Sequence, residues 1–266
     1  MPKIIFDFSL ICFLSVFLLV ACDTTSEPIY EERPVEELYN KAMDLLEAKN
    51  YRGATQQFDE VERQHPYSVW ATKAQLMAAY AYYQANRYDD AIAALERFIQ
   101  LHPAHPDAPY AVYLKGLSYY EQISDVARDQ KMTQLSLTAL KEVISRFPRS
   151  RFAKDARVKL DLTFDHLAGK EMEIGRFYQG QGQLLAATNR FKLVVDKFQT
   201  TTHTPEALHR LTECYLALGM KGEAQKSASV LGHNFPGSVW YKDSYGLIKG
   251  KDRPNEGIRA PWYEFW

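Results

Sequence analysis

AAYAYYQANRYDDAIAALERFIQLHP, residues 78–103, contains the features that decide the fold. Ala79 and Ala91 are small, Tyr82 is aromatic, and Pro103 closes the stretch. Two helices that cross closely need a small side chain on each, and a proline ends the second helix because it has no backbone N–H. The stretch therefore predicts two antiparallel helices joined by a short turn.

The same pattern recurs along the chain. Twelve residues separate a small residue of each second helix from a closing position at Ala54–Pro66, Ala91–Pro103, Ser136–Pro148, Ala187–Gln199 and Ala224–Pro236. The small residues expected on the first helices are Ala42, Ala79, Gly116 and Gly175. This spacing predicts an all-α tetratricopeptide-repeat solenoid of about five helix-turn-helix units over residues 35–236, followed by a capping helix at 237–248.

The boundaries of the repeats carry local signals. Asn50, Asn86 and Gly219 mark turns between paired helices, and the sequences HPYS, FPRS and FPGS offer Ser68, Ser150 and Ser238 as N-caps. The middle of the chain departs from the regular period. We expect a longer polar connection at residues 121–134, and an additional helix over 151–167 before another that begins near Lys170.

The first 34 residues read as a targeting sequence and a linker. Lys3 precedes an apolar stretch, Phe8–Val20, that is too short to span a bilayer. Leu19-Val20-Ala21-Cys22 resembles a bacterial lipobox. We expect a lipoprotein signal peptide at 1–21, an N-acyl and S-diacylglycerol modification of Cys22, and a flexible tether at 22–34. The Gly/Pro-rich tail, 249–266, ends in PWYEFW and is either flexible or a docking segment.

Composition and motifs argue against several function classes. The net charge is −1, with 32 basic and 33 acidic residues, so nucleic acid is not an expected partner. His102 and His105 lack a nearby third ligand for a metal, and Gly180-Gln181-Gly182 lies at a helix end, not after a strand. We expect no catalytic residues, no metal and no cofactor apart from the covalent lipid.

A binding surface is the remaining prediction. The first helices of the second and third units place one set of side chains on the concave face, and Lys73 lies beside them. The set consists of Leu76, Tyr80, Tyr83, Tyr110, Tyr113, Leu117 and Tyr120. Tyrosines form an amphipathic surface that suits an extended peptide. The alternative is that several of these residues pack between units as core.

Three stretches carry a family resemblance: DHLAGKEMEIGRFYQGQGQLLAATNRF at 165–191, HPYSVWATKAQLMAAYAYY at 65–83 and LHPAHPDAPYAVYLKGLSYY at 101–120. Together with the lipobox, they resemble the BamD (ComL/YfiO) family of outer membrane assembly lipoproteins. The resemblance implies a periplasm-facing component of the machinery that folds and inserts β-barrel proteins. It implies four partners, namely unfolded outer membrane proteins, a POTRA domain of a BamA-like insertase, other assembly lipoproteins and the outer membrane itself.

The resemblance also implies a role for one residue. The Asn189-Arg190 pair matches a family motif in which the arginine bridges to an acidic residue of the POTRA domain, whereas a solvated surface arginine is the alternative. Two other classes of function are alternatives: a repeat lipoprotein for pilus secretin assembly or Tol-Pal-linked constriction, and a lipid-anchored hydrolase. Asp23 is similar to a residue that retains lipoproteins at the inner membrane in some enteric bacteria, so the outer membrane assignment rests on the family resemblance.

Overall fold

The computed structural model describes residues 32–250. Residues 1–34 and residues 35–266 are separate units, and of the first only the non-helical residues 32–34 are described. The expected signal peptide, the lipidation site Cys22, most of the tether and residues 251–266 of the aromatic tail lie outside the described residues.

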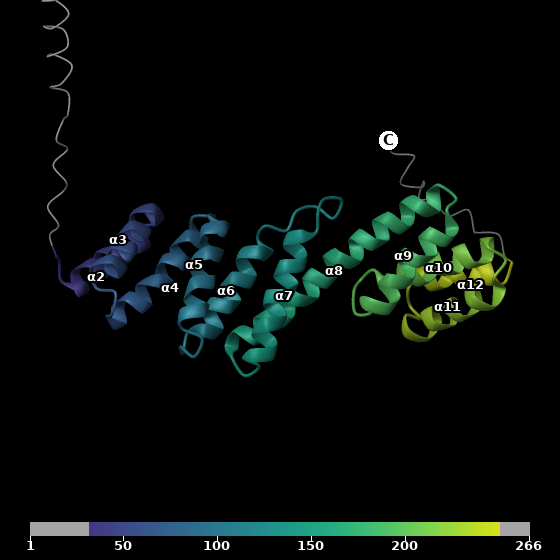
Figure 1. Ribbon diagram of the computed structural model, residues 1–266. Helices are drawn as coiled ribbons and strands as arrows, with labels where there is room; N and C mark the ends of the chain where they lie inside the picture. The colour runs from purple at the N-terminus through teal and green to yellow at the C-terminus, as the bar shows by residue number, and fades with distance from the viewer. Residues whose placement is uncertain (1–31, 251–266) are drawn as a thin grey trace, which may run out of the picture. The chain divides into compact units, whose positions relative to one another are not determined.

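All regular structure between residues 32 and 250 is α-helical, as predicted (Figure 1). The helices are α2 (Val35–Glu47), α3 (Tyr51–Gln64), α4 (Val69–Gln84), α5 (Tyr88–Leu101), α6 (Ala108–Tyr120), α7 (Lys131–Arg146), α8 (Arg151–Gly180), α9 (Leu184–Lys197), α10 (Thr204–Ala217), α11 (Lys221–Asn234) and α12 (Val239–Ile248). No helix in this range combines the length and the apolar character that crossing a bilayer requires.

The helices pack in the order of the chain. Each first helix pairs with the helix that follows it, which gives the five pairs α2–α3, α4–α5, α6–α7, α8–α9 and α10–α11. The last helix, α12, packs against both α10 and α11. First helices of successive units also contact one another, α2 with α4, α4 with α6 and α6 with α8. The tetratricopeptide-repeat architecture is confirmed.

Small residues lie at the helix crossings, as the pattern predicts. Ala42 and Ala79 are fully buried. A Cβ atom built on Gly116 would lie 3.1 Å from Leu140 of α7, and the Ser136 hydroxyl donates to the Gly116 carbonyl at 3.2 Å. These close contacts favour a small residue at the crossing, in agreement with the alanine, glycine or serine that the repeat has there.

The predicted serine caps are confirmed. Ser68, Ser150 and Ser238 each accept a hydrogen bond at 3.1 Å from the backbone N–H three residues later, at the starts of α4, α8 and α12. Each bond satisfies one of the N–H groups that a helix start leaves without an intrahelical partner.

The turns inside four of the five pairs share one backbone feature. Lys49, Asn86, Gly182 and Gly219 have positive φ angles of 59°, 57°, 73° and 77°, and each precedes the small residue of its second helix by five positions. Asn86 and Gly219 were predicted as turn residues. At the first turn the left-handed residue is Lys49, whereas Asn50 caps α3 by accepting from the Gly53 N–H at 3.1 Å.

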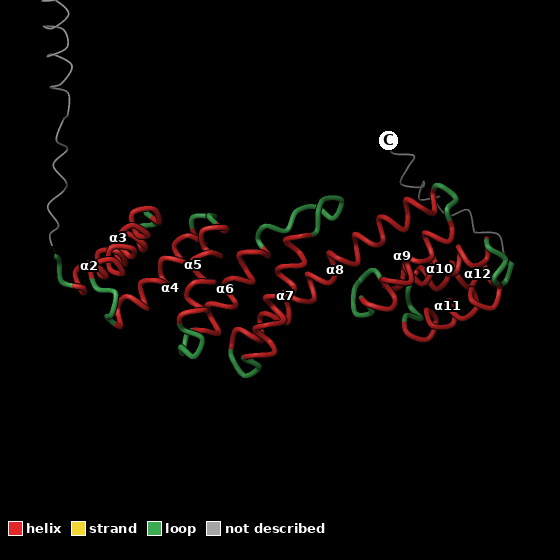
Figure 2. The backbone as a smooth tube through the Cα atoms, in the orientation of Figure 1, coloured by secondary structure: helices red, strands yellow, loops and turns green. Residues whose placement is uncertain are grey.

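The middle of the chain contains a long connection, as predicted, and a continuous helix where two were expected. The long connection inside the third unit is confirmed at residues 121–130, and Figure 2 shows it between α6 and α7. The two separate helices expected over 151–167 and from Lys170 were wrong, because α8 runs without a break from Arg151 to Gly180. No proline interrupts it. Gly169 is buried in its interior, where a Cβ would lie 3.2 Å from His203 and 3.4 Å from Val126.

Helix α8 therefore belongs to two units. Its first half carries Ala153 and Ala156, which pack into a core cluster with Leu140 and Val143 of α7. Its second half carries Ala168 and Met172, which pack with Phe191 and other buried residues of α9. The helix thus connects the N-terminal and C-terminal halves of the solenoid through a continuous backbone.

Candidate functional site

The predicted site residues lie in two places, and the first is an aromatic row on the first helices of the second and third units. We call Tyr80 and Tyr83 of α4 and Tyr110, Tyr113, Leu117 and Tyr120 of α6 the tyrosine row. All six side chains are partly exposed. They lie where α4, α6 and the first half of α8 stack on one another.

Leu76 does not belong to this surface. Only 6% of it is exposed, and it packs with Ala79, Leu95 and Leu114 in a core cluster. It faces the neighbouring helices α5 and α6, so its assignment to a binding groove was wrong. Lys73, one turn earlier, is exposed, and its Nζ lies 5.0 Å above the ring of Trp70.

Two tyrosine hydroxyls in the row, those of Tyr83 and Tyr113, donate to carboxylates. The Tyr83 hydroxyl donates to Glu121 Oε1 at 3.3 Å, and burial together with the charge of Glu121 raises the pKa of Tyr83 to about 12. The Tyr113 hydroxyl donates to Asp155 of α8, and burial raises the pKa of Tyr113 as well. Both phenols therefore stay protonated at neutral pH and act as donors.

Helix α8 supplies three residues that were not predicted for this site. The Phe152 ring lies 5.2 Å from that of Tyr110 and is stacked on that of Tyr113 at 5.4 Å. Lys159 Nζ lies 4.9 Å above the ring of Tyr120. Residues 152, 155 and 159 have the spacing of one helix face, which is the signal that could have identified them. The row is thus an inter-unit contact with partly exposed rings.

The second predicted site residue, Arg190, lies on α9 and is engaged within the chain. Its Nη1 donates to Glu171 Oε2 of α8 at 3.0 Å. The side chain of Arg190 is 40% exposed, and that of Glu171 is 19% exposed. Arg190 is therefore accessible and already paired with a carboxylate.

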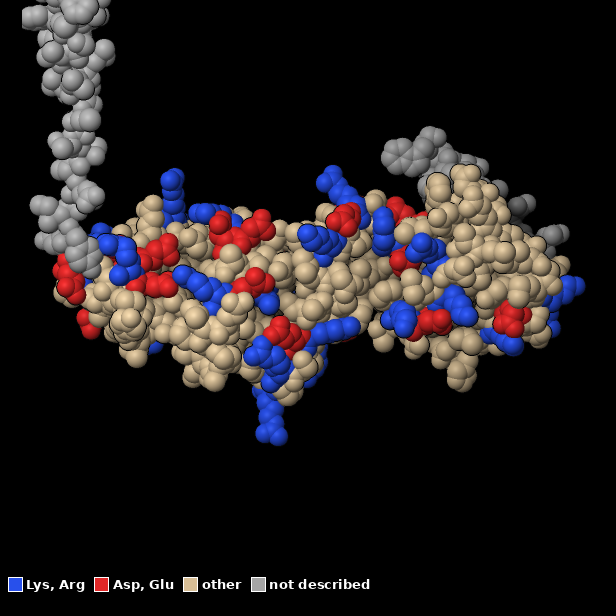
Figure 3. Space-filling view, in the orientation of Figure 1, with Lys and Arg blue, Asp and Glu red and all other residues tan. Residues whose placement is uncertain are grey.

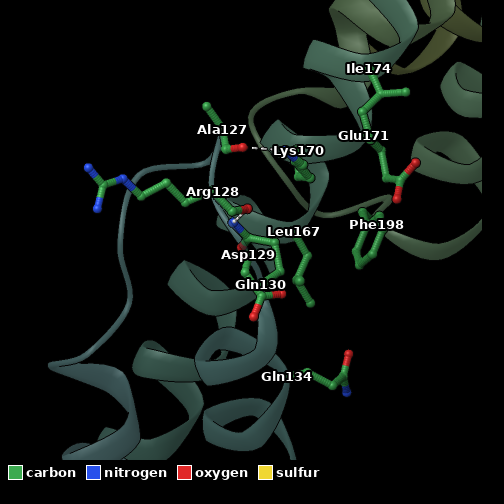
Figure 4. Close-up of a pocket in the computed structure, with 10 residues that line it drawn as sticks. All are labelled: Ala127, Arg128, Asp129, Gln130, Gln134, Leu167, Lys170, Glu171, Ile174 and Phe198. Atoms are coloured by element: carbon green, nitrogen blue, oxygen red, sulfur yellow. Dashed lines mark hydrogen bonds between the residues drawn. The ribbon is translucent and has the colours of Figure 1, made fainter.

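An open hollow of about 590 Å³ lies next to this pair (Figure 4). Its lining comes from the 121–130 connection, from the start of α7, from α8 and from the end of α9. The residues are Ala127, Arg128, Asp129, Gln130, Gln134, Leu167, Lys170, Glu171, Ile174 and Phe198. Lys170 Nζ donates to the Ala127 carbonyl at 2.7 Å, and this bond holds the connection against α8.

Two histidines and one cysteine pack within the fold. The rings of His102 and His105 pack around Phe98, at 5.3 and 5.5 Å. Cys214 is buried, and burial raises the pKa of its thiol to about 11, which makes it a poor nucleophile. Within residues 32–250 no group of three or more His, Cys, Asp or Glu side chains is placed to hold a metal ion.

The charged surface is mixed. On the face shown in Figure 3, acidic and basic side chains alternate over the helices, and neither sign dominates. The chain is thus a helical-repeat solenoid, and solenoids of this class present extended surfaces of the kind that binding scaffolds use.

Comparison with known proteins gives the family. Residues 31–231 match the model of the YfiO family, described as outer membrane lipoprotein. The chain is 53% identical to outer membrane protein assembly factor BamD of Caulobacter vibrioides over 220 residues, which cover 83% of this chain and 72% of that protein. It is 48% identical to the BamD of Rickettsia prowazekii over 81% of this chain and 86% of that protein. It is also 33% identical to the BamD of Neisseria meningitidis serogroup A over the full length of both. The chain belongs to the BamD/YfiO family of outer membrane lipoproteins.

Proposed function

We propose that this chain is a non-catalytic scaffold of the outer membrane β-barrel assembly machinery. Its N-terminal half would bind unfolded barrel precursors, and its C-terminal half would bind a POTRA domain of the BamA-like insertase. The proposal is carried by the partly exposed tyrosine row, in a chain whose relatives are named outer membrane protein assembly factors.

The chemistry of the tyrosine row suits an extended, aromatic-rich segment. Tyrosine rings provide large contact areas and lose little rotamer entropy on binding. The carboxylates of Glu121 and Asp155 lie at the edge of the row and can accept hydrogen bonds from the backbone N–H groups or basic side chains of such a segment. A strand of a barrel protein before insertion offers both features, because its aromatic side chains and unpaired N–H groups are exposed.

Arg190 is the proposed contact with the insertase. A guanidinium can bind a carboxylate through two parallel hydrogen bonds, which suits an acidic residue on the partner. Because 40% of the Arg190 side chain is exposed on α9, a partner domain can reach it without unfolding the repeat. Helix α8 contributes both to the tyrosine row and to this contact, so it joins the two proposed binding functions.

The proposed location follows from the first residues. Lipidation of Cys22 would anchor the solenoid at the periplasmic face of the outer membrane. Several acyl chains give stable anchoring, since each buried CH₂ contributes ~0.8 kcal/mol. Other assembly lipoproteins are proposed as further partners, on the basis of the family alone.

Site-specific cross-linking tests the substrate part of the proposal. A photo-activatable residue at position 80, 113 or 120, in the full-length lipoprotein, should form adducts with a nascent barrel protein, whereas the same residue at Ser145 of α7, outside the row, should not. The same probe at Arg190 should form adducts with the insertase. Adducts with the insertase but none with substrate would reject the substrate surface, and recovery of a secretin or Tol protein instead of the insertase would reject the assembly role.

A further inference from the structure

The side chain of Glu171 takes part in two features of the structure. Its Oε2 accepts the hydrogen bond from Arg190 Nη1 at 3.0 Å, and its side chain also lines the hollow beside α8 (Figure 4). Whatever enters the hollow therefore meets the same carboxylate that occupies Arg190. The state of the Arg190 pair and the occupancy of the hollow are linked through one side chain.

We propose that Glu171 competes, within the chain, with the partner's carboxylate for Arg190, and that the adjacent hollow takes an apolar side chain of the same partner. This inference rests on the proposed binding of the insertase at Arg190. The partner segment would carry an acidic residue next to an apolar one. Its carboxylate would replace Glu171 at the guanidinium.

Charge complementarity supports the exchange. A guanidinium has five N–H donors. Among residues 32–250, Glu171 is the acidic residue with which Arg190 forms an ion pair. Partly exposed pairs of this kind contribute little net free energy, so an incoming carboxylate with better geometry can displace Glu171. Because the exchange replaces one acidic partner with another, it selects acidic ligands over neutral or basic ones.

Most of the residues that line the hollow are polar or charged, but one part of the lining suits an apolar side chain. Leu167, Ile174 and Phe198 contribute apolar surface, while Arg128 and Asp129 place charges of both signs on the 121–130 connection. Figure 4 shows Glu171 directed toward Phe198 and the Arg128 guanidinium directed away from the hollow. The lining therefore offers an apolar contact close to a releasable carboxylate.

Hydrogen bonds within the chain hold the connection that lines the hollow. The Ala127 N–H donates to Asp125 Oδ1 at 2.8 Å, and the Ala127 carbonyl accepts from Lys170 Nζ at 2.7 Å. These two bonds fix the 121–130 connection both to itself and to α8. A site that is already ordered loses less conformational entropy on binding, which favours its use as a docking point.

Titration of the full-length protein with the purified periplasmic domain of the insertase tests the competition. Glu171→Gln keeps the side-chain size, removes the competing charge and should tighten binding about two- to five-fold. Asp161→Asn on the same helix, exposed and outside the hollow, is the matched control and should leave the affinity unchanged.

The outcomes separate the inference from the proposed function. If Arg190→Ala leaves the affinity unchanged, the proposed insertase contact is rejected. If Arg190→Ala weakens binding while Glu171→Gln fails to tighten it, the contact stands and the competition is rejected.

Two further variants test the apolar subsite. Ile174→Ser should weaken binding about five-fold or more, whereas Val158→Ser, which replaces a 60% exposed residue of α8 outside the hollow, should not. If Ile174→Ser lowers the melting temperature, Gln134→Trp is the variant to use. It places a bulky ring at the exposed rim, so it should block the hollow and weaken binding. Unchanged affinity in the folded variants would overturn the subsite.

Discussion

The Cβ position of Gly175 on α8 lies 2.4 Å from Cε1 of Phe191 on α9. No real side chain fits at that distance, and Phe191 is fully buried, so its ring cannot move aside. Gly175→Ala should therefore lower the free energy of unfolding by about 2 kcal/mol, as overpacking does in well-packed cores. Urea unfolding followed by circular dichroism measures this difference.

Gly222→Ala on α11 is the matched control, because nothing lies within 4 Å of the Cβ position there. Alanine favours the helix over glycine, so this variant should be as stable as the parent or up to ~1 kcal/mol more stable. Equal effects of the two substitutions would show that steric contact at the crossing does not matter.

The N-cap of α8 gives a second prediction. Ser150→Ala removes the acceptor for the Ala153 N–H and should cost about 1 kcal/mol of stability. Ser145→Ala on exposed α7 surface removes a hydroxyl that bonds only the Glu142 carbonyl and should cost clearly less. The comparison is made by chemical denaturation, and a smaller loss for Ser150→Ala than for Ser145→Ala would contradict the capping role.

The first turn predicts a stabilising change. Lys49 has a φ of 59°, a left-handed conformation that costs a side chain with a Cβ roughly 1 kcal/mol. Lys49→Gly should raise the free energy of unfolding by up to ~1 kcal/mol. Lys41→Gly, in the interior of α2, should lower it by a similar amount. A lower melting temperature for Lys49→Gly than for the parent would contradict the claim that the left-handed conformation of Lys49 costs stability.

The pH dependence of stability should depend on Glu213. Burial alone would raise the pKa of this carboxyl, but the hydrogen bond from His209, the charges of His209 and Arg210 and the hydrogen bond from Gln179 together lower it to about 2. Because the folded-state pKa lies below the unfolded value, the stabilisation is present above pH ~4.5 and is lost as the pH falls toward 2. The shift corresponds to at most about 3 kcal/mol.

Glu213→Gln should therefore lower stability at pH 7 and flatten its loss between pH ~4.5 and ~2, measured by denaturation at a series of pH values. Glu223→Gln, which removes an exposed carboxylate paired with Lys226, should leave the pH profile unchanged. A parent and a Glu213→Gln variant with parallel pH profiles would rule out this source of acid sensitivity.

The sequence predicts the repeat because the repeat is a local pattern. The crossing at Gly175, the serine caps and most of the turns follow from spacing and side-chain size within one unit. The continuity of α8 does not, because the longer repeat interval in the middle of the chain predicts two separate helices there. Gly169 lets His203 and Val126 approach the helix, and these contacts come from distant loops.

The site follows the same division. Helical periodicity places the tyrosines of α4 and α6 on one face of each helix, so that face can be predicted from sequence. How deeply each of these residues is buried cannot be predicted in the same way. Leu76 is a core residue because α5 and α6 cover it. The contacts of Asp155 with Tyr113 and of Glu171 with Arg190 join residues 42 and 19 positions apart, which one sequence does not pair.

Peptide binding tests the central claim most directly. A synthetic peptide corresponding to the last strand of a barrel protein is titrated into the full-length parent and into a Tyr113→Ala/Tyr120→Ala variant, and the periplasmic domain of the insertase is titrated into both. The double variant should bind the peptide at least about ten-fold more weakly, because two aromatic contacts are lost, while its affinity for the insertase domain stays the same. Equal peptide affinity in the folded double variant would contradict the assignment of the tyrosine row as the substrate surface.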